Sequence, residues 1–140
     1  MESLLVSDYM NRRAVKLTVD MPIAEAVERL LTSKQSGGPV VDAHNKVVGF
    51  LSEQDCLSKM ITSSYYREQV CRIKDVMQTE VLSVKPYSSV LELAELMLKA
   101  KPKIYPVIDD DGFLLGSISR SEVLNAIDVQ LQDGYKAKAS

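Results

Sequence analysis

The sequence predicts an α+β protein made of two similar halves, each with the element order β-α-β-β-α. One observation is an internal repeat: a shift of 67 positions places residues 6–58 on residues 73–125 without a gap, and twelve of these 53 positions are identical. A second is that apolar residues recur at helical spacing at matching places in both halves. A third is that short β-prone runs flank these helices, again in both halves. Duplication of one unit explains all three.

The first two elements of each unit are a strand and a one-faced helix. The segments AVKLTVD (14–20) and VLSVKPY (81–87) are β-prone. Helices are expected over 22–34 and 89–101, because their apolar residues are spaced i, i+3, i+4, i+7, i+8. These residues are Ile23, Ala26, Val27, Leu30 and Leu31 in the first copy, and Val90, Leu93, Ala94, Met97 and Leu98 in the second.

Two strands and a second helix complete each unit. The segments GPVVD and YPVID are read as buried strands, each with a proline near its start, where a missing N–H is tolerated. A turn follows (AHNK or DDG), then a third strand (VVGFLS or LLGSIS) and a helix (EQDCLSKMI or RSEVLNAIDVQL). A single unit would leave one face of its sheet uncovered, so we expect the two copies to pack across a pseudo-two-fold axis.

The repeat divides the chain into four segments. We assign 1–62 to repeat 1, 63–72 to a helical crossover, 73–131 to repeat 2 and 132–140 to a flexible tail.

Composition narrows the class of protein. Apolar residues make up 46% and charged residues 26%, as in a folded globular domain. The net charge of −2 provides no overall basic field for nucleic acid or an anionic membrane, and no apolar run reaches the roughly 20 residues that span a bilayer. The two cysteines, Cys56 and Cys71, lack zinc-site spacing and are expected to be reduced. We therefore expect a cytoplasmic protein that binds neither nucleic acid nor membrane.

The repeated turns GFLSEQD (49–55) and GSISRSE (116–122) each place an acid three residues after a serine at a helix start. One interpretation is a capping box, in which serine and acid satisfy backbone N–H groups of the first turn. The other is a ligand site, since a helix N-terminus suits a phosphate and a carboxylate can accept both hydroxyls of a ribose. The two interpretations are compatible.

Together these features resemble a tandem pair of CBS (cystathionine β-synthase) domains, often called a Bateman module. The resemblance rests on Tyr9-Met10 and Val76-Met77, on the Pro39–Asp42 and Pro106–Asp109 segments, and on the two repeated turns. It covers about residues 3–130. It implies a regulatory module that binds AMP, ADP, ATP or a related adenosyl ligand such as S-adenosylmethionine in the cleft between the repeats. The signal would pass to an effector protein.

The resemblance also implies two sites, each combining the turn of one repeat with the base-binding segments of the other. Site A would comprise Ser52, Asp55, Val81, Leu82, Ser83, Lys103, Ile104 and Tyr105. Site B would comprise Val15, Lys16, Ser36, Gly37, Gly38, Ser119, Arg120 and Glu122. Position 122 departs from the family pattern, which has Asp, so we rank site A above site B.

Several of these residues allow a second interpretation. Tyr105 could stack on a base or pack in the core, and Gly37 and Gly38 could admit a ligand or only make a tight turn. Arg120 opposes the helix dipole, which a nearby phosphate would justify, but it could also be an ordinary surface residue.

Other functions are less well supported by the sequence. The main alternative is a non-catalytic dimerisation module whose ligand clefts are vestigial. An enzyme is not expected, because His44 has no partners for catalysis, and the run Asp109–Asp111 fits a turn better than a metal site. We expect a homodimer, no metal and no catalytic cofactor.

Overall fold

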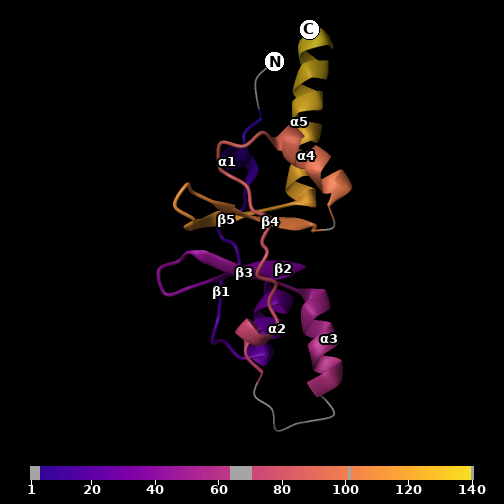
Figure 1. Cartoon of the computed structure of the whole chain (residues 1–140). Helices are drawn as coiled ribbons and strands as arrows, with labels where there is room; N and C mark the ends of the chain where they lie inside the picture. Colours follow the sequence, from indigo (N-terminus) through magenta and orange to yellow (C-terminus); the bar gives the residue numbers. More distant parts are fainter. Residues whose placement is uncertain (1–3, 64–70, 101, 140) are drawn as a thin grey trace.

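The computed structural model describes residues 4–63, 71–100 and 102–139. Two sheets face each other in the middle of the molecule, and the helices cover their outer faces (Figure 1). Strands β2 and β4 contact each other across the interface between the sheets. The α+β class and the pairing of the two repeats are as predicted.

Each repeat contributes one sheet and its helices. In repeat 1 the elements are α1 (Val6–Tyr9), β1 (Leu17–Thr18), α2 (Ile23–Ser33), β2 (Gly37–Val41), β3 (Val47–Ser52) and α3 (Glu53–Ser63). In repeat 2 they are the 3₁₀ helix η1 (Ile73–Asp75), α4 (Val90–Lys99), β4 (Ile104–Ile108), β5 (Leu114–Ser119) and α5 (Arg120–Ala139). The sheet orders are β1-β2-β3 and β4-β5, with β1 parallel to β2 and the other pairs antiparallel.

The first strand of each repeat is shorter than predicted. In repeat 1 it is the two-residue β1, with Leu17 opposite Val40. In repeat 2 the expected strand over 81–87 is reduced to a single parallel bridge between Val84 and Val107. Pro86 has no N–H to donate, and a turn in which Ser88 N–H donates to Lys85 O follows at once. The ladder therefore stops after one residue.

The segments that precede the first strands are exchanged between the repeats. Val6 is buried in the core of repeat 2, and Ile73 is buried in the core of repeat 1. The Val6 N–H donates to Ser88 O at 3.0 Å, and the equivalent Ile73 N–H donates to Met21 O at 2.9 Å. Figure 1 shows α1 beside β5, on the side of repeat 2. Each core therefore contains residues of both repeats.

The two cores use equivalent positions of the repeat. Pairs buried in both are Leu17/Val84, Ile23/Val90, Ala26/Leu93, Val40/Val107, Leu51/Ile118 and Cys56/Val123. The helical faces predicted from periodicity are buried or partly buried except at their C-terminal ends, where Leu31 is 64% exposed and Leu98 is 89% exposed. Cys56 and Cys71 are both free thiols.

The two remaining segment predictions concern the crossover and the tail. Most of the crossover expected over 63–72 lies outside the described residues. The flexible tail was expected to begin at residue 132, but α5 continues to Ala139. Lys136, Ala137, Lys138 and Ala139 all have high helix propensity, and the single Gly134 does not end the helix.

Candidate ligand-binding site

The two repeats meet where the leading segment of each crosses the last strand of the other. Phe50 of β3 exchanges hydrogen bonds with Gln78, at 2.9 and 2.8 Å, and Ser117 of β5 does the same with Asn11, at 2.7 and 2.9 Å. The equivalence of these two bridges follows the shift of 67. Phe50 and Ser117 are the second residues of the two repeated turns, so each bridge brings the other repeat next to a turn.

This crossing explains the glycine that opens each turn. A Cβ on Gly49 would lie 2.5 Å from Met77 Sδ and 3.0 Å from Gln78 O. A Cβ on Gly116 would collide with the carbonyl oxygen of Asn11. Only a residue without a side chain lets the other repeat pass this closely.

Both turns form the capping boxes that the sequence predicted. Ser52 Oγ accepts the Asp55 N–H at 3.0 Å, and Asp55 Oδ2 accepts the Ser52 N–H at 3.1 Å. In the second turn Ser119 Oγ accepts the Glu122 N–H at 3.4 Å, and Glu122 Oε1 accepts the Ser119 N–H at 2.9 Å. These bonds fix the starts of α3 and α5.

A cavity of about 490 Å³, named cavity A here, lies at the start of α3. Its lining residues come from both repeats: Ser36, Phe50, Ser52, Glu53, Gln54, Gln78, Pro102, Lys103 and Ile104. A volume of this size is typical of small-molecule sites.

A second cavity of about 390 Å³, cavity B, lies at the start of α5. It is lined by Asn11, Ser33, Lys34, Gln35, Ser36, Lys103, Ile104, Ser119, Arg120, Ser121 and Glu122. Most of these positions are repeat equivalents of cavity A residues. Ser36, Lys103 and Ile104 line both cavities, which therefore share a wall.

The two carboxylates of the turns are held differently. Asp55 Oδ2 also accepts a hydrogen bond from Gln78 Nε2 at 3.0 Å, so this carboxylate is tied to a side chain that lines cavity A. Glu122 Oε1 instead accepts the hydroxyl of its own Ser119 at 2.8 Å. The extra methylene of Glu lets the carboxylate fold back onto its own cap.

The walls of the cavities also differ in side-chain size. Gly37 of β2 lies beneath the ring of Phe50, and a Cβ at position 37 would be 2.7 Å from Phe50 Cε1. At the equivalent positions of repeat 2, the large residue is Ile104 and the small one is Ser117. Gly37 therefore makes room for the Phe50 ring, whereas a Cβ on Gly38 would meet Val15 less closely, at 3.3 Å from its carbonyl oxygen and 3.5 Å from its side chain. Both glycines are strand residues of β2 and do not form a separate turn.

The structure brings together part of predicted site A. Ser52, Lys103 and Ile104 line cavity A, and Asp55 reaches it through Gln78. Val81, Leu82 and Ser83 are not among the residues that line cavity A. Tyr105 is fully buried in the core of repeat 2, so in the structure its ring packs in the core. Burial raises the pKa of its hydroxyl.

Half of predicted site B lines cavity B. Ser36, Ser119, Arg120 and Glu122 line cavity B. Val15 and Lys16 line an adjoining groove that shares Ser33 with cavity B. Gly37 and Gly38 are buried in β2.

The sequence did not point to several lining residues: Asn11, Ser33, Lys34, Gln35, Phe50, Glu53, Gln54, Gln78, Pro102 and Ser121. The repeat does relate Asn11 to Gln78, and this equivalence is the signal that could have identified that pair.

Negative charge gathers at the start of α3. Burial raises the pKa of the Cys56 thiol, and the nearby carboxylates of Asp55 and Glu53 raise it further. At the start of α5, position 120 carries an arginine where α3 has Glu53.

The acidic run Asp109–Asp111 forms a turn, as predicted. Asp109 Oδ1 accepts the N–H groups of Asp111 and Phe113, both at 2.9 Å. Asp42, its repeat equivalent, accepts those of His44 and Lys46, and these bonds lower the pKa of the Asp42 carboxyl.

Comparison with known proteins gives the family. The model of the CBS domain matches residues 6–62 and again residues 73–129. The chain belongs to the CBS domain family. The two matches coincide with the internal repeat, so the chain carries a pair of CBS domains.

Solved structures of CBS-pair proteins are similar over nearly the whole chain. CBSX2 of Arabidopsis thaliana, solved in complex with AMP, is 27% identical, with a TM-score of 0.79 over 91% of this chain and 98% of that chain. AcuB of Vibrio cholerae, whose name refers to acetoin utilization, is 28% identical, with a TM-score of 0.82 over 97% of this chain and 98% of that one.

The CBS pair also matches part of larger proteins. Inosine-5′-monophosphate dehydrogenase of Methanocaldococcus jannaschii is 28% identical over 110 residues, which are 79% of this chain and 21% of that enzyme. The chain thus spans about a fifth of that enzyme. Within the described part of the chain, no helix has the length and apolar character that crossing a membrane requires.

Proposed function

We propose that this CBS pair is a regulatory module that binds adenine nucleotides or related adenosyl ligands in cavities A and B and passes the signal to a partner protein. The main support for the proposal is that both repeats contribute lining residues to each cavity. Each combines a capped helix start of one repeat with residues of the other repeat. A ligand in either cavity would therefore contact both repeats and could change their relative position. The AMP complex of the related CBSX2 supports the ligand class.

In this proposal each part of the ligand has a counterpart in the protein. Where the ligand carries a phosphate, a serine turn would bind it at the helix N-terminus, and Asp55, positioned by Gln78, would accept the ribose hydroxyls. Phe50 and Ile104 would provide the apolar wall for a base in cavity A. Residues 81–83 were expected to contact the ligand but line neither cavity. A ligand would reach them only with the end that lies away from the helix start.

Thermal unfolding in the presence of ligand tests this function. AMP, ADP, ATP, S-adenosylmethionine and adenosine should be compared with guanosine and with no ligand. A ligand present at 100 times its dissociation constant stabilises the folded state by about 2.7 kcal/mol, which raises the melting temperature by several degrees. If none of the adenosyl compounds shifts the transition at millimolar concentration, the alternative of a dimerisation module with vestigial clefts is the better account.

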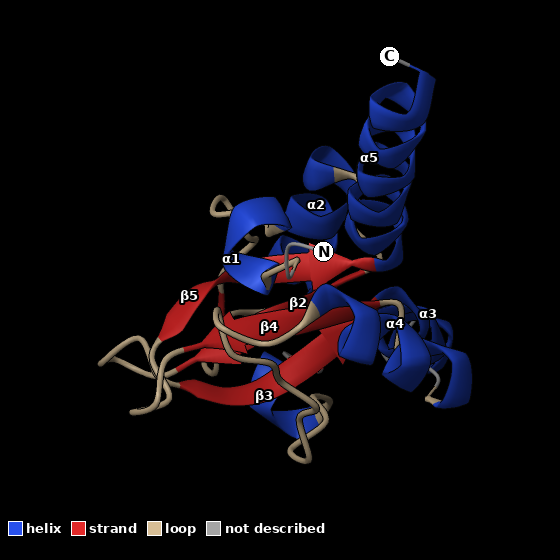
Figure 2. Cartoon of the chain, turned by 90° about the horizontal axis from the view of Figure 1, so that it is seen from above, coloured by secondary structure: helices blue, strands red, loops and turns tan. Residues whose placement is uncertain are grey.

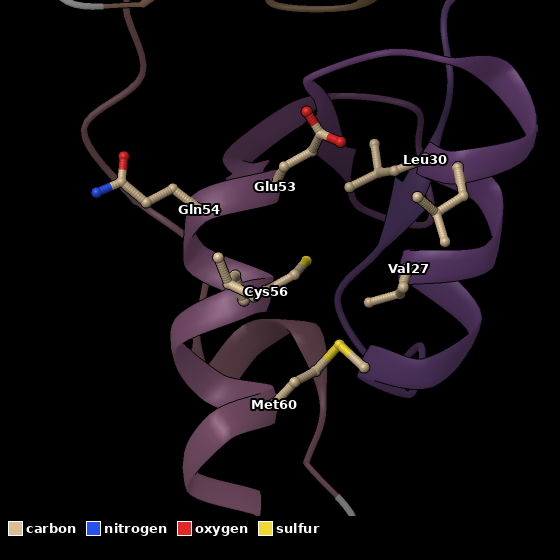
Figure 3. A pocket seen from close by; sticks show the side chains of 8 residues that line it. Val27, Leu30, Glu53, Gln54, Cys56 and Met60 are labelled. Carbon is tan, nitrogen blue, oxygen red and sulfur yellow. The ribbon is translucent and has the colours of Figure 1, made fainter.

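We also propose that the module is a homodimer. Helices α2 and α3 border a groove of about 430 Å³ whose lining is mainly apolar, and Val27, Leu30, Cys56 and Met60 project into it in Figure 3. Leu57 on its rim is 61% exposed. A contiguous patch of exposed apolar side chains is typical of a subunit contact.

Light scattering tests the dimer directly. The expected mass is twice that of the 15.6 kDa chain, and Leu57→Lys should shift the equilibrium toward monomer, because it places a charge in the contact. Leu115→Lys, on β5 away from this groove, is the matched control. A wild-type mass of one chain at micromolar concentration would contradict the dimer.

A further inference from the structure

We propose that the two cavities select ligands of different charge: cavity B takes a phosphate-bearing adenosyl ligand, and cavity A takes an adenosyl ligand without phosphate. This inference rests on the proposed function, and it names the ligand class of each cavity. It reverses, for phosphate, the ranking of the two sites that the turns alone suggested.

Cavity B has an excess of positive charge. Lys34, Lys103 and Arg120 line it, and Glu122 is the only acidic residue among the described residues of its lining. Within the described residues none of these three cations forms an ion pair; the ion pairs there are Arg29–Glu25, Lys74–Asp20 and Lys85–Asp110. Glu122 Oε1 accepts the N–H and the hydroxyl of Ser119, so this carboxylate is held on its own turn as one negative charge against three positive ones. Three unpaired cations therefore face one cavity, which suits a dianionic phosphate.

The backbone places two of these cations close to the helix start. Arg120 is the first residue of α5, and its N–H donates to the carbonyl oxygen of Lys103 at 2.8 Å. A cation at a helix N-terminus is unfavourable with respect to the helix dipole. An anion bound between Arg120 and Lys103 would remove this unfavourable interaction and would also meet the positive end of the helix.

Cavity A has the opposite charge at the equivalent position. Glu53 is the first residue of α3, where its N–H donates to Ser36 O at 2.8 Å in the same geometry as Arg120. Among the described residues that line cavity A, Lys103 is the only basic one. A phosphate at this helix start would lie beside the carboxylates of Glu53 and Asp55, and like charges at such short range repel. The repulsion would offset the attraction of the helix N-terminus.

The remaining lining of cavity A suits an uncharged nucleoside. Phe50, Pro102 and Ile104 provide an apolar wall, which cavity B has only at Ile104. Gln78 lines the cavity and donates to Asp55 Oδ2 at 3.0 Å, so the other oxygen of this carboxylate would be the acceptor for ribose hydroxyls. Adenosine fits this combination of apolar wall and hydrogen-bond acceptor without placing a charge near Glu53.

Isothermal titration of the 140-residue chain with AMP and with adenosine tests the assignment. The informative variants are Arg120→Ala in cavity B and Asp55→Ala in cavity A, with Lys99→Ala, an exposed cation in the last turn of α4, as the matched control. Arg120→Ala should weaken AMP about tenfold, since it removes one charge-assisted contact, and should leave adenosine within about twofold of wild type. Asp55→Ala should do the reverse.

A gain-of-function variant completes the test. Glu53→Arg gives cavity A the residue that cavity B has, and it should add a second AMP site per chain. Loss of AMP binding in Asp55→Ala but not in Arg120→Ala would overturn the charge assignment while leaving the proposed function in place. Equal weakening of AMP and adenosine by Arg120→Ala would also overturn it. Failure of wild-type protein to bind either compound would instead contradict the proposed function itself.

Discussion

Cavities A and B descend from the same positions of a repeated unit, yet three exchanges make them different. Phe50 and Gly37 of repeat 1 correspond to Ser117 and Ile104 of repeat 2, and Glu53 corresponds to Arg120. By contrast, the residues that fix the backbone, Gly49/Gly116 and Ser52/Ser119, are identical. The crossing of the repeats therefore needs one backbone geometry, while the side chains of the cavity walls can differ.

The glycines that open the turns give the largest expected effect. Gly116→Ala places a methyl group against the backbone carbonyl of Asn11, which cannot move without breaking the bridge to Ser117. We expect a loss of about 3 kcal/mol in unfolding free energy, at the upper end for overpacking. Gly49→Ala meets mainly the flexible side chain of Met77 and should lose less. Urea denaturation of the two variants measures the difference, and a greater loss for Gly49→Ala would mean that the crossing is tighter in repeat 1.

The order of elements could be predicted because the repeat doubles every signal. Helix periodicity, turn residues and strand propensity are each weak, but residues such as Pro39 and Pro106 place them in the same register twice. The exchange of leading segments could not be predicted. Val6 and Ile73 read as buried residues, but the sequence does not say which of two nearly identical cores each one joins.

The pairing of large and small residues gives the next largest effect. Gly37→Ala should cost about 2 kcal/mol, because its methyl group would overlap the ring of Phe50. In the background of Phe50→Ser, which copies the repeat 2 pairing, the same substitution should cost much less. A double-mutant cycle by urea denaturation measures this coupling. Additive losses would show that the two positions do not share the same space.

Tyr105 gives the smallest effect and has the opposite sign. Its hydroxyl is buried without a hydrogen-bond partner among the described residues, and burying an unpaired polar group is unfavourable. Tyr105→Phe should therefore raise the unfolding free energy by about 1 kcal/mol in a thermal or urea melt. It should leave adenosine binding unchanged, because the ring packs in the core of repeat 2. Weaker adenosine binding in this variant would favour the stacking role.

The candidate site could be predicted only in part. The capping boxes were readable because serine and acid are three residues apart in one turn. The positions of Lys34, Phe50 and Gln78 in the cavity linings could not be predicted from the sequence, because they depend on how the strands and the two repeats pack. The opposite charges at positions 53 and 120 are visible in the sequence. Their significance required the shared geometry of Glu53 and Arg120 at the two helix starts.

A crystal structure of the 140-residue chain grown with AMP would show which cavity takes the phosphate. We expect AMP to bind between the repeats with its phosphate in cavity B, at the start of α5. Lys34, Lys103 and Arg120, which line this cavity, would then contact the phosphate. A phosphate at the Ser52–Asp55 turn would contradict the charge assignment. AMP bound outside both cavities would contradict the account of the cleft as the ligand site.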